Sequence, residues 1–321
     1  MKITNLKKLP ICVLGFGIQG KAQALNLRDS GHNIIIGNIR DKYAKDAKKN
    51  GFKVFTISKA VKLSKIIFVL LPDGIQDKIL KKEIFPNCNP NSTIVFAHGY
   101  WLRFEAKDFS LKYNFLMIAP RYPGRQIRDE YLKSSGVPAF IDIVKDYNGD
   151  AKKICNLLCK SLGFKKGGII NIPYNKEAEI DLFIEQFMAP LFFSAVEHSY
   201  NYLVKNGYPK EAVCMELYFS GELGAVRTMM GKYGLYKTMQ TNASPTAQYG
   251  ISSSIKKVWS KELDINIKKQ LDRIRSGKFS KELSKTMLSR KTVNQFLKSK
   301  VSKSIRDTEN ILKKKLNKPE G

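Results

Sequence analysis

Short, continuously apolar segments alternate with segments of helical pattern through the first 150 residues of the chain. Apolar segments of this length, bounded by glycine, proline or polar residues, are typical of buried strands. Strands that are apolar on both faces and separated by helices indicate a parallel sheet that is covered by helices on both sides. The strands are predicted at residues 11–16, 33–37, 65–72, 92–99, 115–120 and 138–144.

The pattern changes near residue 175, where apolar residues begin to recur at intervals of three and four. That spacing is typical of amphipathic helices. We therefore predict an α/β domain with a doubly wound sheet over residues 1–170, followed by an all-α domain over residues 171–321. The second domain ends in a basic tail, whose last stretch of about 20 residues is expected to fray.

The charge of the chain is strongly positive: 56 Lys and Arg residues stand against 28 Asp and Glu residues, a net charge of +28. A nucleic-acid-binding surface would gather arginine on one face, interleaved with aromatic side chains. Here lysine dominates and is spread along the sequence. A solvated lysine-rich surface is therefore favoured, and nucleic-acid binding is the weaker alternative. The hydrophobic share of 43% excludes a wholly disordered chain.

The sequence shows no sign of membrane insertion or export. No apolar segment approaches the length of about 18 residues that a membrane span needs, and no signal segment precedes the first strand. The five cysteines are scattered, and no histidine cluster accompanies Cys155 and Cys159, which stand four residues apart. This pattern favours reduced thiols over a zinc site or a disulfide framework. We expect a soluble, cytoplasmic protein with no membrane partner.

A glycine pattern follows the first predicted strand and opens the helix after it. Gly15, Gly17 and Gly20 have the spacing GxGxxG. Between a strand and a helix, this spacing allows a sharp bend, a close approach of a pyrophosphate to the backbone, and tight packing of helix on strand. The sequence therefore predicts a dinucleotide cofactor here, and a glycine-rich turn without a ligand is the alternative.

The end of the second predicted strand bears on which dinucleotide binds. NAD sites commonly place an acid there for the ribose diol. This strand is instead followed by Asn38, Arg40 and Lys42, which suit a 2′-phosphate, so NADPH is favoured. Two alternatives stay open: Asp41 is that acid in a shifted alignment and NADH binds, or the basic residues only reflect the lysine-rich composition.

Two carboxylates and one histidine are candidates for metal binding and proton transfer. Asp181 and Glu185 stand four residues apart in an otherwise apolar helical segment. Both therefore share one helix face and suit a hard cation such as Mg²⁺; an exposed acidic face is the alternative. His98 follows a predicted strand, at the edge where open α/β sheets bind ligands. It is a candidate for proton transfer or, alternatively, a structural residue.

Arginine is concentrated after another predicted strand, at Arg121, Arg125 and Arg128. The guanidinium group binds carboxylates and phosphates in a bidentate manner. The cluster therefore predicts an anionic substrate, and ordinary surface arginine is the alternative.

Several motifs stand in one order along nearly the whole chain. They are GFGIQGKAQALNLRDSG, LLPDGIQ, FAHGYW, APRYPGRQIRDEY, GVPAFI, EAEIDLFIEQ and SPTAQYG. In this order they resemble ketol-acid reductoisomerase in its short form. The resemblance implies an N-terminal Rossmann domain, a knotted helical C-terminal domain, and a homodimer whose subunits share active sites.

The resemblance also implies the reaction. The enzyme would use NADPH and one or two Mg²⁺ ions to move an alkyl group within a 2-aceto-2-hydroxy acid, a small anionic substrate, and then reduce the resulting ketone. This reaction belongs to branched-chain amino-acid biosynthesis. The metal ligands would be Asp181, Glu185 and, from the partner subunit, Glu216. The catalytic residues would be His98, Arg121, Asp181, Glu185 and Ser244. The cofactor would contact Gly15, Phe16, Gly17, Ile18, Gln19, Gly20, Arg40, Leu71, Pro72, Asp73, Gln76, His98 and Gly124.

Among several departures from the family pattern, two bear most directly on the chemistry. Arg121 stands where the family has lysine, and arginine hardly gives up a proton. Ser220 stands where the family places a second glutamate, four residues after Glu216. Glu222 lies two residues further on, on another helix face unless Gly221 reshapes the backbone. These departures leave a second prediction open: a divergent relative that reduces a ketone or an imine with NAD(P)H without isomerising it.

Overall fold

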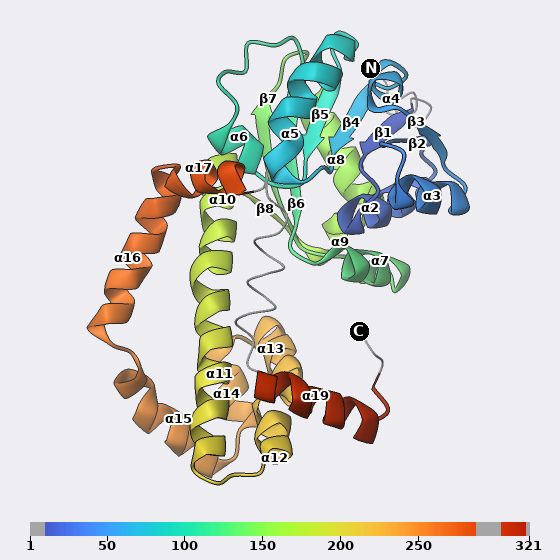
Figure 1. The fold of residues 1–321 in the computed structure, drawn as a ribbon. Helices are drawn as coiled ribbons and strands as arrows, with labels where there is room; N and C mark the ends of the chain where they lie inside the picture. The colour runs from blue at the N-terminus through green and yellow to red at the C-terminus, as the bar shows by residue number, and fades with distance from the viewer. Residues whose placement is uncertain (1–9, 287–302, 319–321) are drawn as a thin grey trace. The chain divides into compact units, whose positions relative to one another are not determined.

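The computed structural model of the chain describes residues 10–286 and 303–318. The chain falls into two compact units, Met1–Asp181 and Leu182–Gly321. The first contains a sheet with helices, and the described part of the second contains helices (Figure 1). The predicted fold class, an α/β domain followed by an all-α domain, is therefore confirmed. The limits 1–170 and 171–321 stay a prediction of where the cofactor-binding domain ends.

One sheet of eight strands forms the centre of the first unit. Its strands are β1 (Ile11–Leu14), β2 (Ile34–Gly37), β3 (Lys53–Phe55), β4 (Ile66–Val69), β5 (Thr93–Phe96), β6 (Asn114–Pro120), β7 (Ala139–Lys145) and β8 (Ile169–Asn171). Their order is β3-β2-β1-β4-β5-β6-β7-β8. Neighbours run parallel except β6 and β7, which are antiparallel. Because the strand order changes direction between β1 and β4, the switch point of this Rossmann-type sheet lies there.

Helices cover both faces of this sheet (Figure 1). They are α2 (Ile18–Asp29), α3 (Lys42–Lys49), α4 (Ile57–Lys62), α5 (Asp73–Ile79), η1 (Leu80–Ile84), η2 (Phe85–Asn87), α6 (Tyr100–Phe104), α7 (Gly124–Leu132), α8 (Ala151–Ser161), α9 (Phe164–Gly167) and α10 (Tyr174–Phe183). Side chains alternate between the faces along each strand. Val13 of β1 joins the core that includes residues of α2 and α8, and Leu14 joins the core that includes residues of α4, η1 and α6. Two continuous cores thus fix the positions of the strand ends.

Two strands of the sheet are not predicted by the sequence pattern. β3 and β8 lie at the two edges, have three residues each, and keep their side chains partly or fully exposed. Neither leaves a continuous apolar segment in the sequence. The prediction of a wholly parallel sheet is wrong at β7. An apolar segment reflects burial and not direction, so the antiparallel pairing of β7 leaves no mark in the pattern.

The second unit is helical in its described part. Its helices are η3 (Ile184–Met188), α11 (Ala189–Lys205), α12 (Lys210–Cys214), η4 (Met215–Phe219), α13 (Glu222–Tyr233), α14 (Leu235–Asn242), α15 (Pro245–Val258), α16 (Lys261–Arg275), α17 (Lys278–Thr286) and α19 (Lys303–Lys315). The prediction that the basic tail frays is wrong for α19, which buries Ile305 and Leu312 in a small core with Tyr200 of α11. The Tyr200 hydroxyl lies 2.8 Å from Thr308 Oγ1. Over 10–286 and 303–318, no helix combines the length and apolar character that a bilayer crossing requires.

Two π-helical turns interrupt the helices of the second unit. η3 continues directly from α10, and η4 continues directly from α12. In a π turn each hydrogen bond spans one more residue than in an α-helix, so the side chains that follow are rotated relative to those before it. These two turns contain Glu185 and Glu216, two of the predicted metal ligands. π turns occur frequently at functional sites, and the metal-binding role of these two glutamates stays a prediction.

Candidate active site

The residues singled out in the first unit follow the carboxyl ends of neighbouring strands. The glycine turn follows β1, Leu71 comes shortly after β4, His98 after β5 and Arg121 after β6. These four strands are adjacent and parallel, so the segments after them meet at one edge of the sheet. Ligands of open α/β sheets bind at this edge, at the switch point.

The glycines after β1 let helix α2 pack closely on the turn and leave its first N–H groups open to a ligand. A Cβ on Gly20 would lie 2.1 Å from the carbonyl oxygen of Gly15, so only glycine lets α2 pack this closely on the turn. Gly17 precedes α2 and provides no side-chain cap, and a Cβ there would meet nothing within 4 Å. The first N–H groups of α2 therefore remain suited to an anion such as a pyrophosphate.

Other residues predicted to contact the cofactor hold this turn in place. Phe16 is buried in the core, whereas Ile18 is 73% exposed. The side chain of Gln19 donates to the carbonyl oxygen of Tyr122 at 3.2 Å. A Cβ on Gly124 would lie 2.1 Å from the carbonyl oxygen of Ile18, so α7 begins directly against the start of α2. Their contact with the cofactor stays a prediction.

Asp41, at the end of the loop after β2, caps α3. Its Oδ1 accepts from the backbone N–H groups of Tyr43 and Ala44, both at 2.9 Å, and from Asn38 Nδ2 at 2.7 Å. Arg40, one residue earlier, is exposed. The carboxylate required by the NADH alternative is thus engaged in capping, whereas the guanidinium of Arg40 is accessible to a phosphate.

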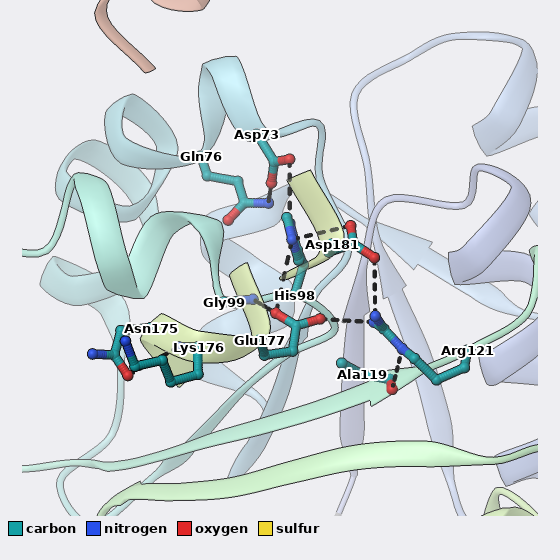
Figure 2. A network of polar contacts seen from close by, with 10 residues as sticks. All are labelled: Asp73, Gln76, His98, Gly99, Ala119, Arg121, Asn175, Lys176, Glu177 and Asp181. Carbon is teal, nitrogen blue, oxygen red and sulfur yellow. Dashed lines mark hydrogen bonds and ion pairs between the residues drawn. The ribbon is translucent and has the colours of Figure 1, made fainter. Parts of the chain in front are cut away.

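The segment after β4 folds into a compact turn. Gln76 Nε2 donates to the carbonyl oxygen of Leu71 at 2.7 Å and to Asp73 Oδ1 at 3.0 Å. Pro72 precedes the first residue of α5, which is Asp73. The second carboxylate oxygen of Asp73 lies 3.7 Å from His98 Nδ1 (Figure 2). This turn therefore links the predicted cofactor edge to the histidine.

Arg121 joins two carboxylates of α10. Its Nη2 donates to Glu177 Oε1 at 2.7 Å, and its Nη1 donates to Asp181 Oδ1 at 2.9 Å (Figure 2). The Glu177 side chain is fully buried, whereas that of Asp181 is 32% exposed. Burial raises the pKa of Glu177, and the charges of His98 and Arg121 offset only part of that effect.

Gly99 explains how α10 reaches the end of β5. A Cβ on this residue would lie 2.2 Å from the carbonyl oxygen of Tyr174 and 3.0 Å from Glu177 Oε2. Without a side chain, the backbone N–H of Gly99 donates to Glu177 Oε2 at 2.7 Å. The glycine thus fixes the buried carboxylate beside the histidine that precedes it.

His98 stands among three carboxylates. Its Nε2 lies 3.3 Å from Asp181 Oδ2 and 3.8 Å from Glu177 Oε2, and its Nδ1 faces Asp73. Burial disfavours the imidazolium, but the contact with Asp73 and the charges of all three acids outweigh it and raise the pKa of His98 to about 9. Nε2 is buried and makes no hydrogen bond within the described residues. At neutral pH the imidazole is therefore charged, and its role in proton transfer stays a prediction.

Sequence reasoning did not select Glu177, although it forms the buried centre of the cluster. A signal was present, because Glu177, Asp181 and Glu185 recur every fourth residue. The predicted arginine cluster, in turn, is dispersed. Arg128 lies on α7 and pairs with Asp29 of α2, so it links these two helices. Of the three predicted arginines, Arg121 is the one that contacts Glu177 and Asp181.

The remaining predicted residues belong to the second unit. Glu185 and Glu216 are exposed on η3 and η4. Ser244 is exposed and caps α15, where its Oγ accepts from the N–H of Ala247 at 3.2 Å. Gly221 has a φ of 93°, and α13 begins immediately after it at Glu222.

That break changes how Glu222 relates to Glu216. The left-handed glycine ends the turn that carries Glu216, so the two acids belong to different helical segments and the six-residue spacing does not decide their relative direction. The roles of Glu185, Glu216 and Ser244 stay predictions.

A divalent cation is chemically suited to the cluster of the first unit. His98, Glu177 and Asp181 each offer a ligand atom, and these atoms lie within 4.8 Å of one another. Carboxylate oxygens are the ligands that Mg²⁺ prefers. In this structure, however, the guanidinium of Arg121 donates hydrogen bonds to Glu177 and Asp181, and the imidazole of His98 lies within 4 Å of both carboxylates.

Comparisons with known proteins cover nearly the whole chain. Residues 5–168 match the family model described as acetohydroxy acid isomeroreductase, NADPH-binding domain, and residues 174–318 match ketol-acid reductoisomerase, C-terminal domain. The chain is similar to the ketol-acid reductoisomerase (NADP(+)) of Caldivirga maquilingensis, with 33% identity over 87% of this chain and 85% of that protein. It is also similar to the protein of the same name from Pyrobaculum arsenaticum, with 35% identity over 86% and 84%.

A solved structure is similar over the whole fold. It is an NADH-preferring ketol-acid reductoisomerase from an uncultured archaeon, with 26% identity and a TM-score of 0.88. The likeness covers 95% of this chain and 94% of that one. Both parts of the chain thus have counterparts in a single solved protein.

Proposed function

The chain belongs to the ketol-acid reductoisomerase family, and from that premise we propose that it isomerises 2-aceto-2-hydroxy acids and reduces the products to 2,3-dihydroxy acids with NADPH. The reaction serves branched-chain amino-acid biosynthesis in the cytoplasm. The observation that carries the proposal is the convergence, at one sheet edge, of the glycine turn after β1 with the cluster of His98, Glu177 and Asp181.

The dinucleotide would lie across the switch point. Its pyrophosphate would face the start of α2 at Gly17, and its 2′-phosphate would pair with Arg40. The engagement of Asp41 in capping α3 favours NADPH over NADH. Because the archaeal structural relative prefers NADH, activity with NADH should be measured beside activity with NADPH.

Mg²⁺ is the metal that we propose, held by Asp181 and Glu185, with Glu216 of a second copy completing a second position. The oxygen-rich cluster around Asp181 supports a cation there. Bound Mg²⁺ would polarise the substrate oxygens. His98 would hold the proton at Nε2 for the substrate oxygen that becomes a hydroxyl, because its raised pKa keeps it charged at neutral pH. Ser244 would bind the carboxylate of the substrate.

We also propose a homodimer. Large apolar side chains of the second unit are exposed to a degree that is unusual for a monomer. Examples are Phe193, Tyr202, Tyr236, Tyr249 and Val258, each at least 66% exposed. A second copy of the chain would cover such side chains, and sedimentation at micromolar concentration would reveal a dimeric mass.

One observation favours a second candidate function. Alkyl migration requires metal ions that polarise the substrate. Because Arg121 Nη1 already contacts Asp181 Oδ1, a metal ion would have to compete with the guanidinium for this carboxylate. A relative that only reduces a ketone or an imine with NAD(P)H would tolerate this arrangement.

Oxidation of NADPH by the purified full chain with Mg²⁺ distinguishes the two functions. We expect turnover with 2-acetolactate and also with 3-hydroxy-3-methyl-2-oxobutanoate, the product of its isomerisation. Turnover with the second compound alone would replace the isomerase by the reductase. Turnover with neither would contradict both.

A further inference from the structure

We infer that Arg121 is a resident cation of this site, and that a divalent metal ion binds Asp181 in competition with its guanidinium. The inference deepens the proposed function, because it assigns to this chain a built-in competitor of its own metal site. Arg121 is in this sense a positioning residue.

The guanidinium of Arg121 makes several further contacts. Besides its bonds to Glu177 and Asp181, its Nε donates to the carbonyl oxygen of Ala119 at 3.3 Å. The group lies over the ring of Phe140, with 4.8 Å between Cζ and the ring centroid. Its backbone N–H donates to the carbonyl oxygen of Pro138 at 2.9 Å. Contacts to both the guanidinium and the backbone N–H of Arg121 indicate a fixed position and not a freely moving surface side chain.

The two carboxylates that Arg121 joins are not equivalent. Glu177 is fully buried, and a buried carboxylate without its cation is strongly disfavoured. Asp181 is 32% exposed, so its oxygens are accessible to an incoming ion. Glu177 therefore keeps the arginine in the site, and Asp181 is the carboxylate that changes partners.

Both oxygens of Asp181 already face nitrogen atoms. Oδ1 accepts from Arg121 Nη1 at 2.9 Å, and Oδ2 lies 3.3 Å from His98 Nε2. A metal ion on Oδ1 would stand against the guanidinium, since like charges at this distance repel strongly in a partly buried site. The metal ion and the guanidinium of Arg121 therefore compete for Asp181.

Removal of the guanidinium should strengthen metal binding. In Arg121→Gln the side chain stays polar and loses its charge, which frees Oδ1 of Asp181. We expect Mn²⁺, a probe that electron paramagnetic resonance detects directly, to bind this variant at least tenfold more tightly than the wild-type chain. The gain should disappear in the double variant Arg121→Gln/Asp181→Asn, because Asp181 supplies the ligand oxygen.

Arg128→Gln is the matched control. It also removes one arginine that pairs with a carboxylate in the first unit, since Arg128 donates to Asn26 and pairs with Asp29 away from the cluster. Its Mn²⁺ affinity should equal that of the wild type. Arg121→Lys is a second test that retains the charge: one ammonium cannot reproduce the planar fork that joins both carboxylates. It should bind Mn²⁺ more tightly than the wild type and more weakly than Arg121→Gln.

Equal Mn²⁺ affinity in the wild type, Arg121→Gln and Arg121→Lys would overturn the inference, as would a gain that survives in the double variant. If Arg121→Gln does not fold by circular dichroism, Arg121→Lys alone decides. The measurement needs no substrate. A gain in metal affinity in a chain that turns over no ketol acid would therefore refute the proposed function and leave the role of Arg121 standing.

Discussion

Glu105, the residue that follows α6, has a carboxyl group in an unfavourable place. Its Oε2 is buried and makes no hydrogen bond among the described residues, and Asp73 and Asp77 lie near it. Burial first, and then the charges of these two acids, raise the pKa of Glu105 from 4.5 to about 7. Replacement by glutamine keeps the shape of the side chain and removes the charge.

The sign of the effect follows from proton binding. Between pH 4.5 and 7 the folded chain binds more protons at Glu105 than the unfolded chain, so the free energy of unfolding falls as the pH rises through this window. The full shift corresponds to about 3 kcal/mol. Because the side chain is partly exposed, we reduce this to about 1–2 kcal/mol. Glu105→Gln should therefore be more stable than the wild type by about 1–2 kcal/mol at pH 8 and nearly equal to it below pH 5.

Urea denaturation, monitored by the fluorescence of Trp101, measures this difference in the free energy of unfolding. Trp101 is a suitable probe because it is buried in α6, close to the substitution. A Trp259→Phe background removes the other tryptophan, which lies in the second unit. Glu130→Gln is the control: its carboxyl is exposed, and Ser135 and Lys133 lower its pKa, so no gain should develop with rising pH. A Glu105→Gln difference that stays constant from pH 5 to pH 8 would refute the reasoning.

Three further outcomes are expected. Arg40→Ala should weaken NADPH binding by about tenfold and NADH binding by less than about twofold in fluorescence titrations, since a charge-assisted contact to the 2′-phosphate is lost; an equal loss for both cofactors would exclude that contact. Gly20→Ala should destabilise the first unit by about 2–4 kcal/mol in urea and abolish NADPH binding, because its Cβ would clash with Gly15. His98→Gln should lower stability below pH 6.5, where the raised pKa of His98 contributes fully, and should match the wild type well above pH 9; a pH-independent difference, measured with chelator present, would contradict the assigned charge.

The sequence predicts the parts of this fold that rest on strong local patterns. Six buried strands and the glycine turn each carry an apolar run or a fixed spacing, and all of them occur in the first unit. β3 and β8 are missed because short edge strands with exposed side chains carry no such pattern. The direction of β7 is missed because pairing depends on the path of the connection and not on the residues of the strand.

The candidate site is predictable in some of its members, since Glu177 is not selected, and it is not predictable in its contacts. His98 and Asp181 are singled out by their positions after a strand and on a helix, and the structure brings them to 3.3 Å. That Arg121 pairs with Asp181, and that Arg128 leaves the cluster for α2, depends on how α7 and α10 pack against the sheet. Long-range packing of this kind has no signature in residue spacing.

The reaction itself is tested most directly by following one carbon atom. 2-Acetolactate labelled with ¹³C in the methyl group on its hydroxyl-bearing carbon would be incubated with the full chain, Mg²⁺ and NADPH, and the product examined by nuclear magnetic resonance. We predict 2,3-dihydroxy-3-methylbutanoate, in which the labelled methyl group is attached to C3, the carbon next to the one that bears the carboxylate. A labelled methyl group that stays on its original carbon in a reduced product, or NADPH that remains unoxidised, would contradict a ketol-acid reductoisomerase.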